Sequence, residues 1–201
     1  MTGFDPSADR YHRFEDGIPP EKNGDYAFLL HIIKSMKPRT GKGARILPHG
    51  ILFRGNAEED IRRNLIKRRI IKAIISLPPN LFYGTGIPAC ILVLDKENAA
   101  ARDGIFMIDA SKGFIKDGAK NRLREQDIQK AMDVFHDYQE IPGYSRMVPL
   151  AEIDDNDYNL NLPRYIDSSD GEVRQDLFAH LNGGIPDADL QELGDYWHVF
   201  P

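Results

Sequence analysis

The chain has 201 residues, of which 41% are hydrophobic and 28% charged, and this composition is ordinary for a globular domain with a buried core. No apolar run reaches the roughly 18 residues that a membrane span needs, and no signal peptide opens the sequence, so we expect a cytoplasmic protein without membrane contact. The single cysteine, Cys90, excludes an internal disulfide and a cysteine-rich metal site, and its apolar surroundings predict a buried structural thiol.

The net charge of −5 conceals two regions of opposite sign. Residues 31–75 contain twelve Lys or Arg against three Asp or Glu, whereas residues 133–201 contain three against fifteen. One interpretation is that the basic region contacts a phosphate backbone. The other is that the basic and acidic regions face each other in the folded chain.

Three amphipathic helices are expected in chain order. Residues 1–24 mix Gly, Pro and charge without periodicity and predict an irregular lead-in. Residues 25–37 (DYAFLLHIIKSMK) repeat apolar side chains at i, i+3, i+4 and i+7, which predicts a helix capped by Asp25. A second helix should open at Asn56, where acidic residues occupy the first turn, and a third should span about 124–138.

Short apolar segments between these helices predict the strands Ala44–Leu47, Lys72–Leu77, Ala89–Leu94 and Ile105–Ile108. The second and third are nearly continuous apolar runs, which is typical of strands covered on both faces. We therefore expect an α/β fold, with a partial sheet domain over residues 25–142, since three or four strands are fewer than a doubly wound sheet normally has. Residues 143–201 are acidic and predict an extended segment followed by short helices at about 172–181 and 187–199.

Sequence motifs for familiar chemistry are absent. The 201 residues contain no G-x-G-x-x-G fingerprint, no phosphate-binding G-x-x-x-x-G-K-[ST], no H-E-x-x-H and no G-x-S-x-G. The six histidines are scattered, and none pairs with another at a metal-ligand spacing. Residue chemistry alone therefore assembles no complete active site.

The stretch SLPPNLFYGTGIPACILVLDK (Ser76–Lys96) joins two predicted strands by a loop that is longer and more apolar than a simple reversal needs. Its glycines permit close backbone approach and its prolines stiffen both ends, so an aromatic side chain could be held where open α/β sheets place their ligands. The alternative, which residue chemistry alone favours, is that Phe82 fills the core and Tyr83 covers its rim. The candidate pocket residues are Phe82, Tyr83, Gly84, Thr85, Gly86 and Pro88.

The second helix and its flanks are strongly basic. Cations outside the apolar stripe could contact nucleic acid, although a charged run is usually a solvated face and cations in a last helical turn already have a dipole reason to exist. The candidate DNA-binding residues are Arg54, Arg62, Arg63, Lys67, Arg68 and Arg69.

The order of DYAFLLHIIKSMK, ARILPHGILFRG, EEDIRRNLIKR and IKAIISLPPNLFYGTGIPACILVLDK resembles the modification subunit of type I restriction-modification systems, a family of DNA adenine-N6 methyltransferases. The resemblance continues through IFMIDASKGF, NDYNLNLPRYI and AHLNGGIPDADLQELGDYWHVFP, so it covers nearly the whole chain. It implies the later half of a Rossmann-like methyltransferase sheet followed by a helical tail. The loop at Phe82–Pro88 would then border the pocket of the target adenine, with Phe82 or Tyr83 beside the base.

The family's donor is S-adenosylmethionine, and its catalytic motif is Asn-Pro-Pro-Tyr/Phe. Neither the donor-binding Gly-rich loop nor this motif occurs in the sequence, and Leu77–Asn80 (LPPN) has the reverse order. We therefore expect a chain that is inactive alone and binds no cofactor by itself. The alternatives are a non-enzymatic docking module for a specificity subunit or DNA, or one half of a methyltransferase that is split over two chains.

The resemblance also implies partners: duplex DNA, and the specificity and restriction subunits of the same system. The acidic tail, through NLNLPRYI (residues 159–166) and the GGIP-to-YW segment, is the candidate contact with the specificity subunit, unless it packs only on its own domain. An exposed strand edge could in addition pair two copies of the chain as a homodimer.

Overall fold

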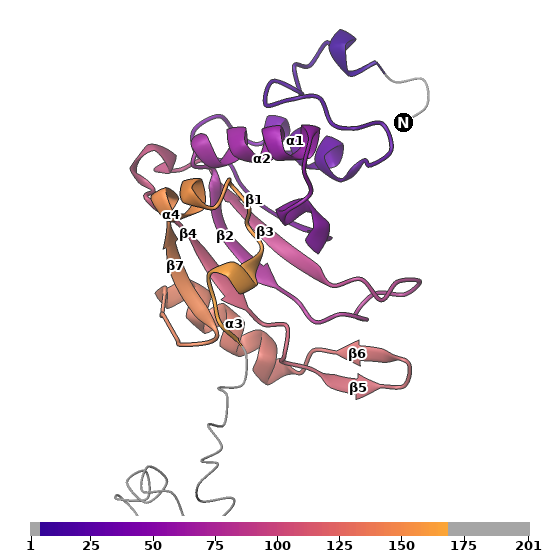
Figure 1. Cartoon of the computed structure of the whole chain (residues 1–201), viewed down its shortest axis with the longest axis vertical. Coiled ribbons are helices and arrows are strands. Elements are labelled where there is room, and N and C mark those ends of the chain that lie inside the picture. Colours follow the sequence, from indigo (N-terminus) through magenta and orange to yellow (C-terminus); the bar gives the residue numbers. More distant parts are fainter. Residues whose placement is uncertain (1–4, 169–201) are drawn as a thin grey trace, which may run out of the picture. The chain divides into compact units, whose positions relative to one another are not determined.

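The computed structural model describes residues 5–168, which form a five-stranded sheet with helices on both faces and a separate two-stranded hairpin (Figure 1). The helices are α1 (Asp25–Ser35), α2 (Ala57–Lys67), α3 (Glu125–Asp137) and α4 (Leu150–Asp155), with 3₁₀ turns at η1 (Pro6–Ala8), η2 (His49–Leu52), η3 (Ala99–Ala101) and η4 (Leu162–Arg164). The strands are β1 (Lys42–Pro48), β2 (Ile71–Ser76), β3 (Ala89–Asp95), β4 (Gly104–Asp109), β5 (Ile115–Asp117), β6 (Lys120–Arg122) and β7 (Ser145–Pro149).

The order of strands in the main sheet is β1-β3-β2-β4-β7. Only β2 and β4 run parallel, with Ala73 opposite Phe106 and Ser76 opposite Asp109, and the other neighbours are antiparallel. The expected α/β class is confirmed, together with the four predicted strands and three predicted helices. The sheet is mostly antiparallel, however, so a Rossmann-like arrangement is not confirmed.

Helices cover the two faces of the sheet unequally. Along β4 the side chains alternate, so that Ile105 and Met107 join the core beneath α1, α2 and α4, whereas Phe106 and Ile108 pack with Val134 of α3. All four β4 side chains are at most 1% exposed, which explains why the sequence of this strand reads as a continuous apolar run. Cys90 lies fully buried in the same core, as predicted, and burial raises the pKa of its thiol to about 12.

The start of α1 differs from the sequence prediction. The cap position is Gly24, no side chain caps the helix, and Asp25 is its first residue. The side-chain oxygen of Asn23 instead accepts a hydrogen bond from the Asp25 N–H at 3.2 Å, while the Asp25 carboxylate pairs with Arg54 at 3.0 Å. The predicted Asp25 cap is therefore wrong, because that carboxylate faces a partner elsewhere in the fold.

The sheet continues beyond residue 142, where the sequence analysis ended the partial domain. β7 pairs with β4, and the following α4 contributes Ile153 to the main core. Further on, the backbone N–H of Leu160 donates to the Leu52 carbonyl at 2.8 Å, and the side chains of Leu160 and Leu162 are 1% exposed. The segment from Gly143 that was expected to be extended is thus largely part of the packed domain, up to residue 168.

Two predictions concern residues outside the described part of the chain. The short helices expected at about 172–181 and 187–199, with the GGIP-to-YW segment, lie there.

Within residues 5–168, no helix combines the length and the apolar character needed to cross a bilayer.

Candidate functional site

The loop that the sequence singled out leaves the sheet at the carboxyl ends of its parallel strands. β2 ends at Ser76 and β4 ends opposite it at Asp109, and the chain then runs through the loop to β3 at Ala89. Ligands of open α/β sheets bind beyond the carboxyl ends of strands, so the loop occupies the expected edge.

The two aromatic side chains of the loop are exposed to different extents. Tyr83 is 94% exposed and Phe82 is 39% exposed, while Ile87 between them and β3 is 60% exposed. Phe82 therefore does not fill the core, and Tyr83 does not cover its rim, so the alternative given for these two rings in the sequence analysis is not supported. Each ring presents a flat apolar surface to solvent, which is the property that stacking on a planar ligand requires.

The two glycines of the loop occupy positions with different geometric constraints. Gly84 has a φ of +77° in open space, a conformation that a side chain would strain. A Cβ on Gly86 would lie 2.9 Å from the side-chain oxygen of Asn80, so a larger residue here would displace that side chain. The backbone of the loop is therefore tightly specified although its aromatic side chains are exposed.

The β5–β6 hairpin holds the loop from outside the sheet, which the sequence analysis did not foresee (Figure 1). The Lys120 ammonium donates to the carbonyls of Phe82 at 2.6 Å and Thr85 at 3.0 Å. Asn121, which is 4% exposed, donates from its amide side chain to the Pro79 carbonyl at 2.7 Å. These bonds, together with the prolines, stiffen the loop on the side away from β3.

Part of the loop lines a small apolar hollow with the end of β1. The hollow has a volume of about 180 Å³, and of the six candidate pocket residues Phe82, Thr85 and Pro88 line it, facing Ile46 and Leu47. The other three, Tyr83, Gly84 and Gly86, do not line it. Sites for small ligands usually have volumes of about 300–1,000 Å³, so this hollow has the size of one wall of a site and not of a complete pocket.

A polar cluster lies beneath the end of the loop. The His49 ring nitrogen Nε2 is 2.9 Å from the hydroxyl of Ser76, and the His49 backbone N–H donates to the Pro88 carbonyl at 3.1 Å. Burial lowers the pKa of His49, and the charge of Asp109 opposes that shift. Because Ser76 is 2% exposed, the cluster does not present a nucleophile, and it serves to anchor the loop to β1 and β2.

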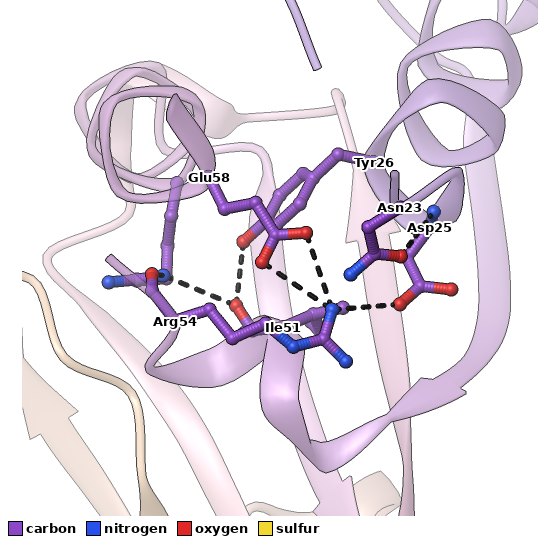
Figure 2. A network of polar contacts seen from close by, with 7 residues as sticks. Asn23, Asp25, Tyr26, Ile51, Arg54 and Glu58 are labelled. Carbon is purple, nitrogen blue, oxygen red and sulfur yellow. Dashed lines mark hydrogen bonds and ion pairs between the residues drawn. The ribbon is translucent and has the colours of Figure 1, made fainter. Parts of the chain in front are cut away.

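Two of the predicted DNA-binding arginines, Arg54 and Arg62, are used within the fold, and Figure 2 shows the first of them. Arg54 pairs with Asp25 at 3.0 Å and with the carboxylate of Glu58 at 3.3 Å. Arg62 is 3% exposed, and its guanidinium donates to backbone carbonyls, at 2.8 Å to Arg54 and 3.3 Å to Ile51. The prediction that Arg62 belongs to a basic surface is therefore wrong, because this side chain replaces missing backbone donors in the interior.

Burial also changes the pKa of the acid in this network, Glu58. Glu58 is 3% exposed, and desolvation raises the pKa of its carboxyl group, while the guanidinium of Arg54 opposes the shift. The Tyr26 hydroxyl donates to the Ile51 carbonyl at 2.7 Å, so α1, η2 and α2 share one polar network (Figure 2). Glu58 and Arg62 are one helical turn apart and in register with the buried Ile61 and Leu65 of α2, so helical periodicity could have placed both on the inward face despite their charge.

The remaining cations of α2 and of the two residues that follow it are mostly matched by acids. Arg63 pairs with Glu59 at 3.0 Å. Arg68 pairs with Asp16 of the lead-in, and Arg69 pairs with Asp103 at 3.2 Å. Lys67 forms no ion pair with residues 5–168, and its ammonium lies 5.5 Å from the centroid of the Tyr158 ring. The predicted phosphate contact by α2 and its flanks remains untested, but most of their cations are already paired with acids of the fold.

Within residues 5–168, no group of His, Cys, Asp and Glu side chains is arranged to hold a metal ion. Around the Phe82–Pro88 loop, the described residues present exposed aromatic rings, hydrogen-bonding groups and the ammonium of Lys120.

The N-6 DNA methylase family profile matches residues 5–173. The type I restriction enzyme MjaVII methylase subunit of Methanocaldococcus jannaschii is 36% identical over 169 residues, which cover 80% of this chain and 29% of that protein. The HindI methylase subunit of Haemophilus influenzae is 33% identical over 168 residues, covering 80% of this chain and 38% of that protein.

The solved structures agree with this assignment. The type I restriction-modification system methyltransferase subunit from Streptococcus thermophilus superposes with a TM-score of 0.72 at 38% identity, over 78% of this chain and 33% of that one. The chain thus spans about a third of the length of these relatives. With the profile matched over residues 5–173 and about four fifths of the chain aligned to these relatives, the chain belongs to the N-6 DNA methylase family and corresponds to part of a type I restriction-modification methylase subunit.

Proposed function

We propose that this chain supplies the target-base side of a DNA adenine-N6 methyltransferase of a type I restriction-modification system. The observation that carries the proposal is the loop Phe82–Pro88, which is fixed in its backbone yet leaves Tyr83 94% exposed at the carboxyl end of β2. An enzyme that modifies a base must take it out of the stack and hold it between apolar side chains. A stiff loop with two exposed rings provides such a surface at little entropic cost.

The two rings have different roles in this proposal. Phe82 and Thr85 line the small hollow next to Ile46, so they would form the side wall against which the extruded adenine rests. Tyr83 stands away from the hollow and would stack on the base or occupy the space that the base leaves. Aromatic stacking contributes about 1–3 kcal/mol per base, which offsets part of the cost of extrusion.

S-adenosylmethionine is the donor that the family implies, and the described residues do not fit it. The hollow at the loop is apolar and has a volume of only about 180 Å³. A hollow of about 650 Å³ lies instead near the start of β2 and the end of β3, opposite the loop, and is lined by charged side chains such as Lys72 and Asp95. We therefore assign no donor contact to residues 5–168, and the catalytic amide and donor site are proposed to come from other polypeptide.

A binding experiment tests the role of the loop. The 201-residue chain is titrated into a fluorescent duplex that carries one bulged, extrahelical adenine, and into a fully paired duplex. We expect tighter binding to the bulged duplex, with a preference of about fivefold or more if stacking contributes at least ~1 kcal/mol. Tyr83→Ala should remove this preference, whereas Tyr11→Ala, which removes an aromatic ring that is 66% exposed on the lead-in, should leave it unchanged. Equal affinity of the unaltered chain for both duplexes would contradict the proposal.

The whole protein is proposed to act together with a specificity subunit and a restriction subunit. Within residues 159–166 the large apolar side chains are not open to this contact, because Leu160, Leu162 and Ile166 are at most 4% exposed, whereas Arg164 is exposed. We therefore propose that the specificity subunit binds residues 169–201, where the sequence holds an aromatic pair, Tyr196 and Trp197. Pull-down with the cognate specificity subunit should succeed with the full chain and fail with Tyr196→Ala/Trp197→Ala. Equal recovery of both would show that the contact lies elsewhere.

A further inference from the structure

The cations of the β5–β6 hairpin differ from those of α2 because little negative charge opposes them. Lys116 is exposed, forms no ion pair with residues 5–168, and has its ammonium 5.8 Å from the centroid of the Phe114 ring. The ammonium of Lys120 contacts two carbonyl oxygens and no carboxylate of the described chain. Arg122 pairs with Asp117 at 3.1 Å, but both side chains are more than 60% exposed, so this pair contributes little and can rearrange.

The hairpin is joined to the Phe82–Pro88 loop and its approach by several hydrogen bonds. Besides the Lys120 bonds to Phe82 and Thr85, the Asn121 backbone N–H donates to the Asn80 carbonyl at 3.0 Å. Asn121 lies opposite Lys116 in the hairpin and is buried against the loop, so it fixes the position of the strands that carry the cations. Two of the three ammonium protons of Lys120 are used by carbonyls, and the third remains for an external acceptor.

We propose that the β5–β6 hairpin binds the DNA phosphates that flank the base held at the Phe82–Pro88 loop, through Lys116, Lys120 and Arg122. The inference rests on the proposed function, because it takes the loop as the place of the extruded base. An extruded nucleotide rotates about its own backbone, so its neighbouring phosphates stay at the mouth of the pocket. A cationic hairpin bonded to the rim of that pocket is placed to neutralise them.

The same reasoning assigns α2 a different role from the one its sequence indicates. The guanidinium groups of Arg63, and of Arg68 and Arg69 just after the helix, face acids of the fold, and a DNA contact would have to break those pairs first. Within residues 5–168, Lys67 is the cation of α2 that forms no such pair. Lys116 and Lys120 of the hairpin require no exchange, and Arg122 has only an exposed pair with Asp117. Among the described residues, the phosphate contact is therefore expected at residues 115–122 and not on the basic helix.

The salt dependence of DNA binding tests this assignment. Binding of the 201-residue chain to a fluorescent paired duplex is measured by anisotropy over a series of NaCl concentrations, because each neutralised phosphate contributes about 0.9 to the slope of log affinity against log salt. Lys116→Gln/Arg122→Gln should weaken binding and reduce the slope by about 1.8. The matched control for α2, Arg63→Gln/Arg68→Gln, removes two cations that are paired with acids, one in the helix and one directly after it, and should leave the slope unchanged. Far-UV circular dichroism confirms that both variants are folded.

The outcomes separate this inference from the proposed function. A slope that falls in the α2 variant and not in the hairpin variant would overturn the inference, and so would a chain that does not bind duplex at low salt. The hairpin variant should lower affinity for bulged and paired duplexes by the same factor, whereas Tyr83→Ala should abolish the preference for the bulge and keep the slope. If the preference is absent but the hairpin slope effect is present, the base-binding role fails while the phosphate contact stands.

Discussion

Replacing Arg62 by Met should destabilise the protein strongly without being a DNA-binding mutation. Its guanidinium donates to the carbonyls of Tyr158 at 2.8 Å, Arg54 at 2.8 Å and Ile51 at 3.3 Å. The Ile51 carbonyl keeps its bond from the Tyr26 hydroxyl, so the substitution deprives two carbonyls of the donor that reaches them. Each buried polar group that loses its partner costs about 1–3 kcal/mol, so we expect a loss of about 3–4 kcal/mol in the free energy of unfolding.

Urea unfolding followed by circular dichroism measures this loss, which is a large share of the roughly 5–15 kcal/mol that stabilises a typical domain. The neighbouring Arg63→Met is the control, because Arg63 is 37% exposed as a side chain and its pair with Glu59 should contribute no more than about 0.5 kcal/mol. A loss below about 1 kcal/mol for Arg62→Met would refute the structural role. Weaker DNA binding at unchanged stability would restore the original interpretation of Arg62 as a surface cation.

Three further predictions follow from the site and the sheet edge. Asn121→Asp should cost more than about 2 kcal/mol in urea unfolding, since it sets a buried carboxylate against the Pro79 carbonyl that now accepts from the amide. Because burial lowers the pKa of His49 below its ordinary 6.5, the unfolded chain binds the proton more readily, so unfolding free energy should fall as pH drops from about 7 through the lowered pKa. His49→Gln should flatten that decline, and superimposable pH curves would count against it. If the exposed β1 edge pairs two copies, light scattering should show a dimer that Ile46→Lys converts to monomer, as Ile46 is 49% exposed there.

The strands that were predicted correctly from the sequence include those that are buried on both faces of the sheet. β2 and β3 are covered by the main core on one face and by the α3 layer on much of the other, so their side chains form apolar runs that are unmistakable locally. β7 was missed because its five residues, SRMVP, lie at the edge of the sheet, where Arg146 and Pro149 are tolerated. β7 pairs with β4, which lies far away in the sequence, and the local sequence of β7 shows no periodicity that would predict this pairing.

The β5–β6 hairpin was missed for a related reason, although one signal was present. Its strands have three residues each and carry mostly polar side chains, so they show no clear apolar alternation. The two residues between them are Gly118 and Ala119, and a glycine at the first central position is a signal of a two-residue hairpin turn, where Gly118 has the positive φ of +60° that such turns use. What the sequence could not supply is the bonding of Asn121 and Lys120 to the loop, which lies about forty positions earlier in the chain.

The pairing of charged side chains is the feature that the sequence predicted least well. The count of cations over residues 31–75 is correct, yet a count cannot show which acids meet them, and those acids come from distant segments. Asp16 of the lead-in reaches Arg68, and Asp103 before β4 reaches Arg69. The hairpin carries three cations and the stretch from Arg54 to Arg69 carries six, but the attraction of a cation for phosphate depends on the net charge that remains after neighbouring acids are counted. The weaker signal in the sequence thus becomes the stronger candidate on the surface, next to the loop where a flipped base would leave its phosphates.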